Sequence, residues 1–358
     1  LNQLNQYCRE PHMLPIYEQI YHRMCGIALD KTAQYAKLPP ALLPWYRQNA
    51  RVLPWRRNRE PYAVWLSEIM LQQTRVEAVR AYYLRFLDAF PTLETLAQAP
   101  EDQLLKLWEG LGYYTRARNL QKAAKIIVSE YAGQFPSEYA QIAALPGIGP
   151  YTAGAIASIC FEAPTPAVDG NVIRLISRIT EQFQPLERPQ SKRAIAMALA
   201  EIYPSNACGD FTQSLMELGA TICLPQTPKC PICPAQSFCM AYQNGTTQLL
   251  PNKEKRRPRR VEERTVFLLN HAGRLALERR KAQGILAGLW QLPNLPGHLS
   301  ETEALQAAAD WNLKPLGIEK AVHKTHVFTH LEWRMVCYSL SCGRAATNFI
   351  WASPEELD

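Results

Sequence analysis

The chain has 358 residues, which suffices for about two domains of ordinary size. It contains no run of about 18 apolar residues, the length that a membrane-spanning helix requires, and its first residues lack the apolar segment of a secretory signal. A membrane protein and a secreted protein are therefore not expected. The net charge of +7 is compatible with a polyanionic partner and equally with plain solubility.

Residues 1–40 are expected to form an N-terminal extension to the first domain. The sequence does not begin with methionine, and Met24 is a plausible natural start. We therefore expect residues 1–23 to be poorly ordered, as the ends of many domains are.

Residues 41–220 have the pattern of one helix after another. Apolar residues repeat at helical spacing, and the prolines and glycines between these stretches suit short connections. Two apolar stripes carry this prediction: Val76, Val79, Tyr83, Phe86 and Phe90 form one, and Leu120, Ala123, Ala124, Ile127, Val128 and Tyr131 form the other.

Glu68 lies within the helical stretch VWLSEIML. A glutamate in the middle of a helix usually belongs to a solvated face. Because its neighbours in sequence, Trp65 and Ile69 among them, are apolar, the carboxyl group could instead be partly buried with a raised pKa.

The segment LPGIGPYTAG at 145–154 stands between two helical stretches. Gly147 and Gly149 permit a tight turn that points backbone N–H groups outward, and a helix beginning near Pro150 adds its positive N-terminal end. An ordinary helix–turn–helix connection is the simpler alternative. The L-P-G-x-G pattern at a helix start favours a helix-hairpin-helix, which binds DNA phosphate without reading sequence.

Asp169, in AVDGNVIRL, precedes another predicted helix, where capping of the helix N-terminus is its simplest role. Taken singly, Glu68 and Asp169 favour structural roles. Beside a DNA-binding hairpin and a metal-binding loop, they suggest an acid and a stabilising carboxylate for cleavage of a glycosidic bond.

That loop is rich in proline and holds four closely spaced cysteines: Cys223, Cys230, Cys233 and Cys239. In a chain that is not secreted, such spacing indicates metal ligands rather than disulfides. Tetrahedral sulfur ligation fits zinc and also fits an iron–sulfur cluster. The single C-x2-C pair favours the cluster without deciding between them.

The sequence changes character at PNKEKRRP. Residues 251–263 are expected to form a basic, solvated linker, for which contact with DNA phosphates is a compatible addition. Beyond it, residues 264–270, 274–280 and 326–333 are typical of short strands, and residues 300–313 are typical of a helix capped by Ser300. A smaller α+β domain is the simplest account.

Several segments occur in an order that resembles the MutY-type adenine DNA glycosylases over nearly the whole chain from about residue 41. They are LPWRRN (53–58), WLSEIMLQQT (65–74), GLGYYTRARNL (110–120), LPGIGPYTAGAI (145–156), VDGNVIR (168–174) and the four-cysteine loop. The order is far more specific than any one motif. This family belongs to the helix-hairpin-helix glycosylase superfamily.

The resemblance implies a mainly α glycosylase domain over 41–250. A six-helix barrel would occupy about 76–165, and residues 41–75 and 166–250 would form a helical domain carrying a [4Fe–4S] cluster on the four cysteines. Residues 264–358 would form a MutT-like domain of the Nudix fold. Because the helical segment after GLWQLPN lacks a glutamate-rich cluster, we expect this domain to recognise the lesion rather than to hydrolyse pyrophosphates.

The resemblance also implies roles for individual residues. Glu68 would protonate adenine, Asp169 would stabilise the oxocarbenium ion, and Tyr151 would assist it. The residues expected to contact DNA or the bases comprise the phosphate-binding Gly147 and Gly149, the wedge residues Gln73 and Tyr113, the adenine pocket of Trp55, Arg56, Leu71 and Gln213, and the 8-oxoguanine reader Phe328, Thr329 and His330. The family's reader is a Phe-Ser-His turn, so threonine here keeps the hydroxyl and adds a methyl group.

Endonuclease III-type glycosylases, which are bifunctional lyases for oxidised pyrimidines, are the closest alternative. Their hairpin carries a lysine where this chain has Tyr151, and a phenol cannot form the Schiff base of strand cleavage. They also lack the C-terminal domain. A non-catalytic lesion sensor would not need both carboxylates, and a zinc-stabilised DNA-binding protein is a further alternative.

The sequence thus predicts a monofunctional DNA N-glycosylase, a hydrolase of base excision repair. Its expected partner is duplex DNA in which adenine is mispaired with 8-oxoguanine or guanine. We expect a monomer in the cytoplasm, associated with the nucleoid if the source is bacterial.

Overall fold

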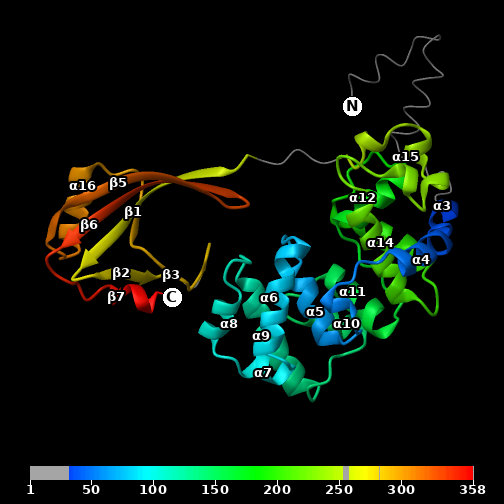
Figure 1. The fold of residues 1–358 in the computed structure, drawn as a ribbon, viewed down its shortest axis with the longest axis horizontal. Helices are drawn as coiled ribbons and strands as arrows, with labels where there is room; N and C mark the ends of the chain where they lie inside the picture. The colour runs from blue at the N-terminus through cyan, green and yellow to red at the C-terminus, as the bar shows by residue number, and fades with distance from the viewer. Residues whose placement is uncertain (1–31, 253–257, 282, 358) are drawn as a thin grey trace, which may run out of the picture. The chain divides into compact units, whose positions relative to one another are not determined.

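The computed structural model describes residues 32–252, 258–281 and 283–357 (Figure 1). The expectations for residues 1–23 and for a start at Met24 lie outside the described residues. The chain divides into two compact units, one ending at Glu254 and the other beginning at Lys255. No described helix combines the length and the apolar character that crossing a bilayer would require.

The regular elements that the structure describes in the first unit, over residues 32–252, are all helices. Its α-helices are α3 (Thr32–Ala36), α4 (Leu38–Asn49), α5 (Pro61–Met70), α6 (Val76–Ala89), α7 (Leu93–Gln98), α8 (Glu101–Leu107), α9 (Thr115–Glu130), α10 (Tyr139–Ala144), α11 (Pro150–Phe161), α12 (Gly170–Ile179), α13 (Pro189–Ala200), α14 (Cys208–Thr221) and α15 (Met240–Gln243). Short 3-10 turns are η1 (Pro54–Arg56), η2 (Cys230–Ile232), η3 (Gln236–Phe238) and η4 (Thr247–Leu249).

Two groups of helices build this unit, with α5 and α11 between them (Figure 1). In one group, α6 buries Val79, Tyr83 and Phe86 on one face, and α9 buries Leu120 and Ile127. Both predicted apolar stripes are therefore confirmed as core-facing stripes. They fix how these helices pack.

The other group has its own core, formed by α12, α14 and the N-terminal helices. Val172 and Ile176 of α12 pack with Leu218 of α14. Tyr35 and Leu38 belong to the same core. The helical unit therefore includes residues before position 41, and α5 packs against α6 and α11.

The second unit is a mixed sheet with one helix and a short 3-10 turn. Its elements are β1 (Arg260–His271), β2 (Arg274–Arg279), β3 (Trp290–Gln291), β4 (Asn294–Pro296), α16 (Glu301–Asp310), β5 (Pro315–Val327), β6 (Leu331–Cys342), β7 (Ile350–Ala352) and η5 (Pro354–Glu356). The strand order is β3-β2-β1-β6-β5, with β4 on β1 and β7 on β2. β1 and β6 pair in parallel, and β5 and β6 form a long antiparallel hairpin (Figure 1).

The core of this unit lies between the sheet and α16. Phe267 and Leu340 on the strands pack with Ala304 and Ala308 on the helix. The predicted cap is confirmed, because the Ser300 side chain accepts a hydrogen bond from the Glu303 backbone in a capping box.

The prediction of one strand over 326–333 is wrong. β5 ends at Val327 and β6 begins at Leu331, so the segment is the turn of a hairpin. The Phe328 amide donates to the Leu331 carbonyl at 2.7 Å, which closes the turn. The segment contains valine, phenylalanine and tryptophan, which strands favour, and no glycine, proline, asparagine or aspartate that would mark a turn, so the sequence pattern concealed it. β1 begins at Arg260, within the segment expected to be linker.

Candidate active site

Glu68 is buried on α5, with only 7% of its surface exposed. Every residue of this helix from Tyr62 to Met70 is buried, as expected of a helix that is apolar on nearly all sides. Burial raises the pKa of the Glu68 carboxyl to about 7. The predicted burial and raised pKa are confirmed, and a substantial fraction of Glu68 is protonated at neutral pH.

Tyr151, in the first turn of α11, contacts Glu68 directly. Its hydroxyl donates a hydrogen bond of 2.6 Å to Glu68 Oε2. Burial and the adjacent carboxylates raise the pKa of Tyr151 well above its ordinary value, so the phenol stays protonated. The bond favours ionised Glu68, but burial outweighs it. The Tyr151 hydroxyl therefore contacts Glu68, whereas the sequence predicted that it would assist Asp169.

Asp169 caps the N-terminus of α12. Its Oδ1 accepts hydrogen bonds from the amides of Asn171 at 2.9 Å and Val172 at 2.8 Å, and its Oδ2 accepts one from the Asn171 side chain at 2.7 Å. Burial raises the pKa of Asp169, and the charge of Asp169 in turn raises the pKa of Glu68. The helix-capping role is therefore confirmed, and the fold brings all three predicted catalytic residues together.

Arg174 connects the Asp169 cap to the cysteine loop. Its Nη2 donates to Asn171 Oδ1 at 2.9 Å and to the Gly219 carbonyl at 2.7 Å. Its Nε donates to the Cys223 carbonyl at 2.7 Å. The orientation of Asp169 therefore depends on a buried network that ends at the first cysteine.

The residues predicted for the adenine pocket come from three elements. Trp55 is buried against Tyr83, with ring centroids 5.3 Å apart, and Arg56 follows it in η1. Leu71 follows α5, and Gln213 lies half-buried on α14.

Glu217 and Arg51 were missed by the sequence interpretation. The buried Glu217 carboxylate accepts hydrogen bonds of 2.8 Å from Arg56 Nη2 and of 2.6 Å from Arg51 Nε. Burial opposes its ionisation, but the two guanidinium groups outweigh burial and lower the pKa of Glu217 to about 2. The one available signal was a mid-helix glutamate in an apolar stretch, the same signal that marked Glu68.

The turn before α11 needs only one of its two glycines for conformational reasons. Gly147 has a φ of +78°, and a Cβ there would lie 2.7 Å from Asn119 Cβ. Gly149 is the N-cap of α11 with a φ of −93°, which other residues adopt readily, and a Cβ there would meet nothing within 4 Å. The open space at Gly149 leaves the helix N-terminus accessible.

Gln73 and Tyr113 both lie in exposed loops with left-handed backbone. Their φ angles are 61° and 47°, which glutamine and tyrosine seldom adopt. Tyr113 is 45% exposed. Such outliers mark segments whose conformation the surrounding structure enforces.

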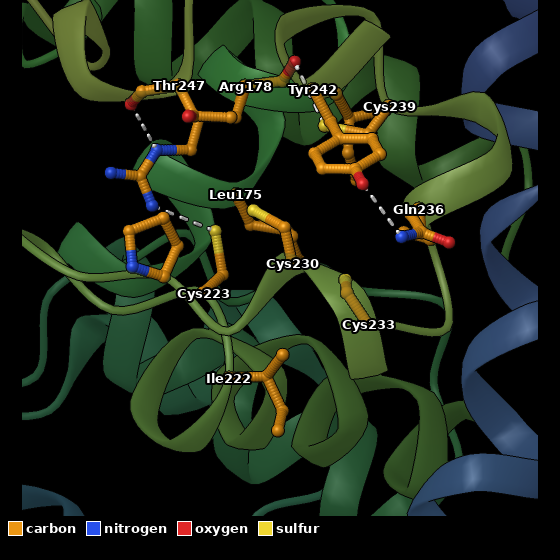
Figure 2. A pocket seen from close by; sticks show the side chains of 13 residues that line it. Leu175, Arg178, Ile222, Cys223, Cys230, Cys233, Gln236, Cys239, Tyr242 and Thr247 are labelled. Carbon is orange, nitrogen blue, oxygen red and sulfur yellow. Dashed lines mark hydrogen bonds between the residues drawn. The ribbon is translucent and has the colours of Figure 1, made fainter. Parts of the chain in front are cut away.

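The four predicted metal ligands, Cys223, Cys230, Cys233 and Cys239, line one pocket (Figure 2). All four are free thiols. Arg178, which is almost fully buried, donates to Cys223 Sγ at 3.3 Å. In the part of the chain that the structure describes, no three His, Cys, Asp or Glu side chains are arranged to hold a metal ion.

The predicted reader lies at the β5–β6 turn of the second unit. Phe328 is half-buried, and its ring meets His326 at 4.5 Å and Trp333 at 5.1 Å between centroids. Thr329 and His330 are exposed. The turn therefore presents two polar side chains beside an anchored aromatic ring.

Comparisons with known proteins agree with this geometry. Residues 66–202 match the HhH-GPD superfamily base excision DNA repair protein family, and residues 264–358 match the NUDIX domain. The chain is 35% identical over 384 residues to the adenine DNA glycosylase of Mus musculus, covering 91% of this chain and 73% of the relative. It is 39% identical over 256 residues to that of Buchnera aphidicola subsp. Baizongia pistaciae, covering 70% and 72%. The chain belongs to the adenine DNA glycosylase family.

Solved structures agree on the fold. A thermostable thymine-DNA glycosylase matches with a TM-score of 0.54 and 28% identity over 60% of this chain and all of its own. A non-covalent endonuclease III–DNA complex matches with a TM-score of 0.51 and 22% identity over 61% of this chain and 99% of its own, which shows the fold alone. The predicted family and fold class of this adenine DNA glycosylase family member are therefore confirmed.

Glu68→Gln should remove a pH-dependent loss of stability. Because folding raises the pKa of Glu68 from 4.5 to about 7, the wild-type protein loses stability as the pH rises through that interval. Glutamine does not ionise, so the unfolding free energy of the variant relative to wild type should rise by about 3 kcal/mol between about pH 4 and about pH 8. Urea unfolding at both pH values measures this. Glu130→Gln, at an exposed position, is the control. If the unfolding free energy of Glu68→Gln relative to wild type is the same at both pH values, the burial of an ionisable carboxyl at position 68 is contradicted.

Proposed function

We propose that this family member removes adenine from duplex DNA where adenine is paired with 8-oxoguanine or guanine, and that it leaves an abasic site. The observation that carries the proposal is the buried Glu68 carboxyl, with its pKa raised to about 7, beside Tyr151 and Asp169. One chain supplies all three groups, which supports a monomeric enzyme. Because DNA is the proposed substrate, we propose that it acts in the cytoplasm, at the nucleoid in a bacterium.

The first requirement of the reaction is an acid. Adenine leaves deoxyribose poorly unless it is protonated, and it must first leave the base stack to reach buried groups. Protonated Glu68 can donate its proton to the extruded base, which contributes about 10²–10⁴-fold to the rate. The Tyr151 hydroxyl fixes Glu68 Oε2, so the carboxyl group is oriented before the base arrives.

The second requirement is a stabiliser for the sugar. When the bond between adenine and C1′ breaks, its electrons leave with the protonated base and positive charge develops on the sugar. Asp169 carries a carboxylate held by three N–H donors, which favour its charged form. Water then bonds to C1′ and gives its proton to Glu68, which restores the acid.

Tyr151 also supports a monofunctional reaction. A lysine at this position could form a Schiff base with the sugar and cleave the strand, but a phenol cannot. With Tyr151 protonated and hydrogen-bonded to Glu68, the product is an intact strand with an abasic site.

DNA would be held at two places on the helical unit. Gly147 and Gly149 lead into α11, whose N-terminal amides and helix dipole suit a backbone phosphate. Gln73 and Tyr113, exposed on separate loops, would enter the stack as wedges.

The four cysteines would hold a [4Fe–4S] cluster. The donor chemistry fits such a group, because four free thiols line one pocket and the buried Arg178 donates to the Cys223 sulfur, although the thiols as placed are not arranged to hold a single metal ion. When bound, the cluster would cross-link the loop that includes η2 and η3, since metal binding and local folding are coupled. A broad visible absorption of the purified protein would support the cluster, whereas a colourless zinc protein would contradict it.

Glu68→Gln should abolish excision and leave DNA binding nearly intact. The variant loses the acid but keeps the phosphate and wedge contacts, so the single-turnover rate should fall by about 10² or more. The substrate is a duplex with adenine opposite 8-oxoguanine, treated with alkali to reveal abasic sites. Glu130→Gln is the control, and wild-type excision by Glu68→Gln would remove Glu68 as the acid. Strand breakage by homogeneous wild-type protein without alkali would contradict the monofunctional reaction.

His330→Ala should reduce the preference for 8-oxoguanine over guanine opposite the adenine. Loss of a polar contact at the β5–β6 turn should cost about 1–3 kcal/mol of discrimination. His323→Ala, an exposed histidine on β5, should leave the preference unchanged. Deletion of residues from 252 onward should lower the preference for 8-oxoguanine at least as much as His330→Ala does. Single-turnover rates and affinities are compared on both mispairs at one salt concentration. If His330→Ala and the deleted protein both keep the full preference for 8-oxoguanine, the discrimination resides at Gln73 and Tyr113.

A further inference from the structure

Arg116, in the first turn of α9, binds the C-terminal end of α5 and the turn that follows it. Its Nη1 donates hydrogen bonds to the carbonyl oxygens of Ile69 at 2.6 Å and Gln72 at 2.8 Å. A weaker bond reaches the Met70 carbonyl at 3.3 Å. One guanidinium nitrogen thus holds the whole turn that leads into Gln73.

The other terminal nitrogen of Arg116 binds a second loop, between α8 and α9. Nη2 donates to the carbonyl oxygens of Leu111 at 2.9 Å and Gly112 at 3.2 Å. Two loops that are about 40 residues apart in the sequence therefore share one side chain. A planar guanidinium suits this task, because its donors point in fixed directions that an ammonium group cannot reproduce.

The bonded carbonyls include those that directly precede the two left-handed residues. The Gln72 carbonyl belongs to the peptide group that continues into Gln73, and the Gly112 carbonyl belongs to the one that continues into Tyr113. The orientation of each peptide group relative to the next residue is its φ angle, which is 61° at Gln73 and 47° at Tyr113. Arg116 therefore fixes both unusual conformations at once.

Trp108 anchors this arrangement in the core. The Arg116 guanidinium lies 5.3 Å from the centre of the Trp108 ring. The indole nitrogen donates to the Gly112 carbonyl at 3.1 Å, and Trp108 is fully buried. Through Arg116, both loops are therefore held against the buried Trp108 side chain, which has a fixed position in the helical unit.

We propose that Arg116 is a positioning residue for base extrusion, which holds Gln73 and Tyr113 at a fixed separation and in the conformation that enters the stack. The inference rests on the proposed function, in which adenine must leave the duplex. The Arg116 guanidinium donates to backbone carbonyls at the C-terminal end of α5 and in the two loops, and among the described residues none of these bonds goes to the side chain of Glu68, Tyr151 or Asp169. Its loss should therefore impair extrusion and spare the chemistry at Glu68.

The test compares two substrates with the same adenine opposite 8-oxoguanine. In one the adenine is fully paired in duplex, and in the other it lies in a short bubble where the base is already unstacked. For Arg116→Lys and Arg116→Gln, the single-turnover rate on duplex should fall by about tenfold or more, and the rate on the bubble should stay within about threefold of wild type. The ratio of the two rates does not depend on how much of a preparation is folded.

Two control variants define the result. Tyr113→Ala should show the same selective loss on duplex. Arg118→Lys makes the same exchange two residues along α9, where the guanidinium pairs with Glu101 at 2.8 Å, and it should keep the wild-type ratio.

Equal loss on both substrates, or loss on neither, would overturn the role of Arg116 and leave the proposed function standing. Failure of the wild-type protein to excise adenine from either substrate would overturn the proposed function itself and the inference with it.

Discussion

The burial of one carboxyl group, that of Glu68, is the constraint on which the site depends. An isolated carboxylate is costly to bury, and a protein usually avoids that cost by keeping the group protonated. The buried, mostly apolar residues of α5 favour the protonated form of Glu68. The Tyr151 hydroxyl donates a hydrogen bond to Glu68 Oε2, so this buried oxygen has a partner. With its pKa raised to about 7, the Glu68 carboxyl can serve as a proton donor at neutral pH.

The same site holds a second buried carboxyl group with different partners. Burial raises the pKa of Asp169 as well, but three hydrogen bonds from the start of α12 favour its charged form. Two carboxyl groups in contrasting environments are the usual means by which one site provides both a proton donor and a stabilising charge. Glu217 extends the contrast, since two arginines lower its pKa to about 2 whereas burial raises the pKa of Glu68 to about 7.

Much of this arrangement was predictable from local sequence. Three features depend only on neighbours within a few residues. They are the apolar stripes of α6 and α9, the cap at Ser300 and the capping of α12 by Asp169. The burial of Glu68 was also predictable, because its own helix supplies the apolar surroundings. Local patterns of this kind survive folding because they are independent of the partner elements.

Other features depend on residues far apart in the chain. Glu217 meets Arg51 and Arg56 across more than 160 positions, and Arg116 joins two loops that carry no shared pattern. The strand predicted over 326–333 was wrong because no glycine, proline, asparagine or aspartate marks the hairpin turn at 328–330. Long-range polar contacts leave no periodic trace in a sequence, so only the folded chain reveals them.

Direct titration of the Glu68 carboxyl tests the central claim. Carboxyl carbons of glutamate are labelled with an isotope, and the infrared or magnetic resonance signal of Glu68 is assigned as the one that Glu68→Gln removes. We expect a pKa of about 7 in the folded protein. We also expect a further rise in Tyr151→Phe, because the hydroxyl that favours the ionised form is gone. A signal that titrates near the ordinary value of 4.5 would contradict the account, because Glu68 would then be ionised at neutral pH and could not protonate the base.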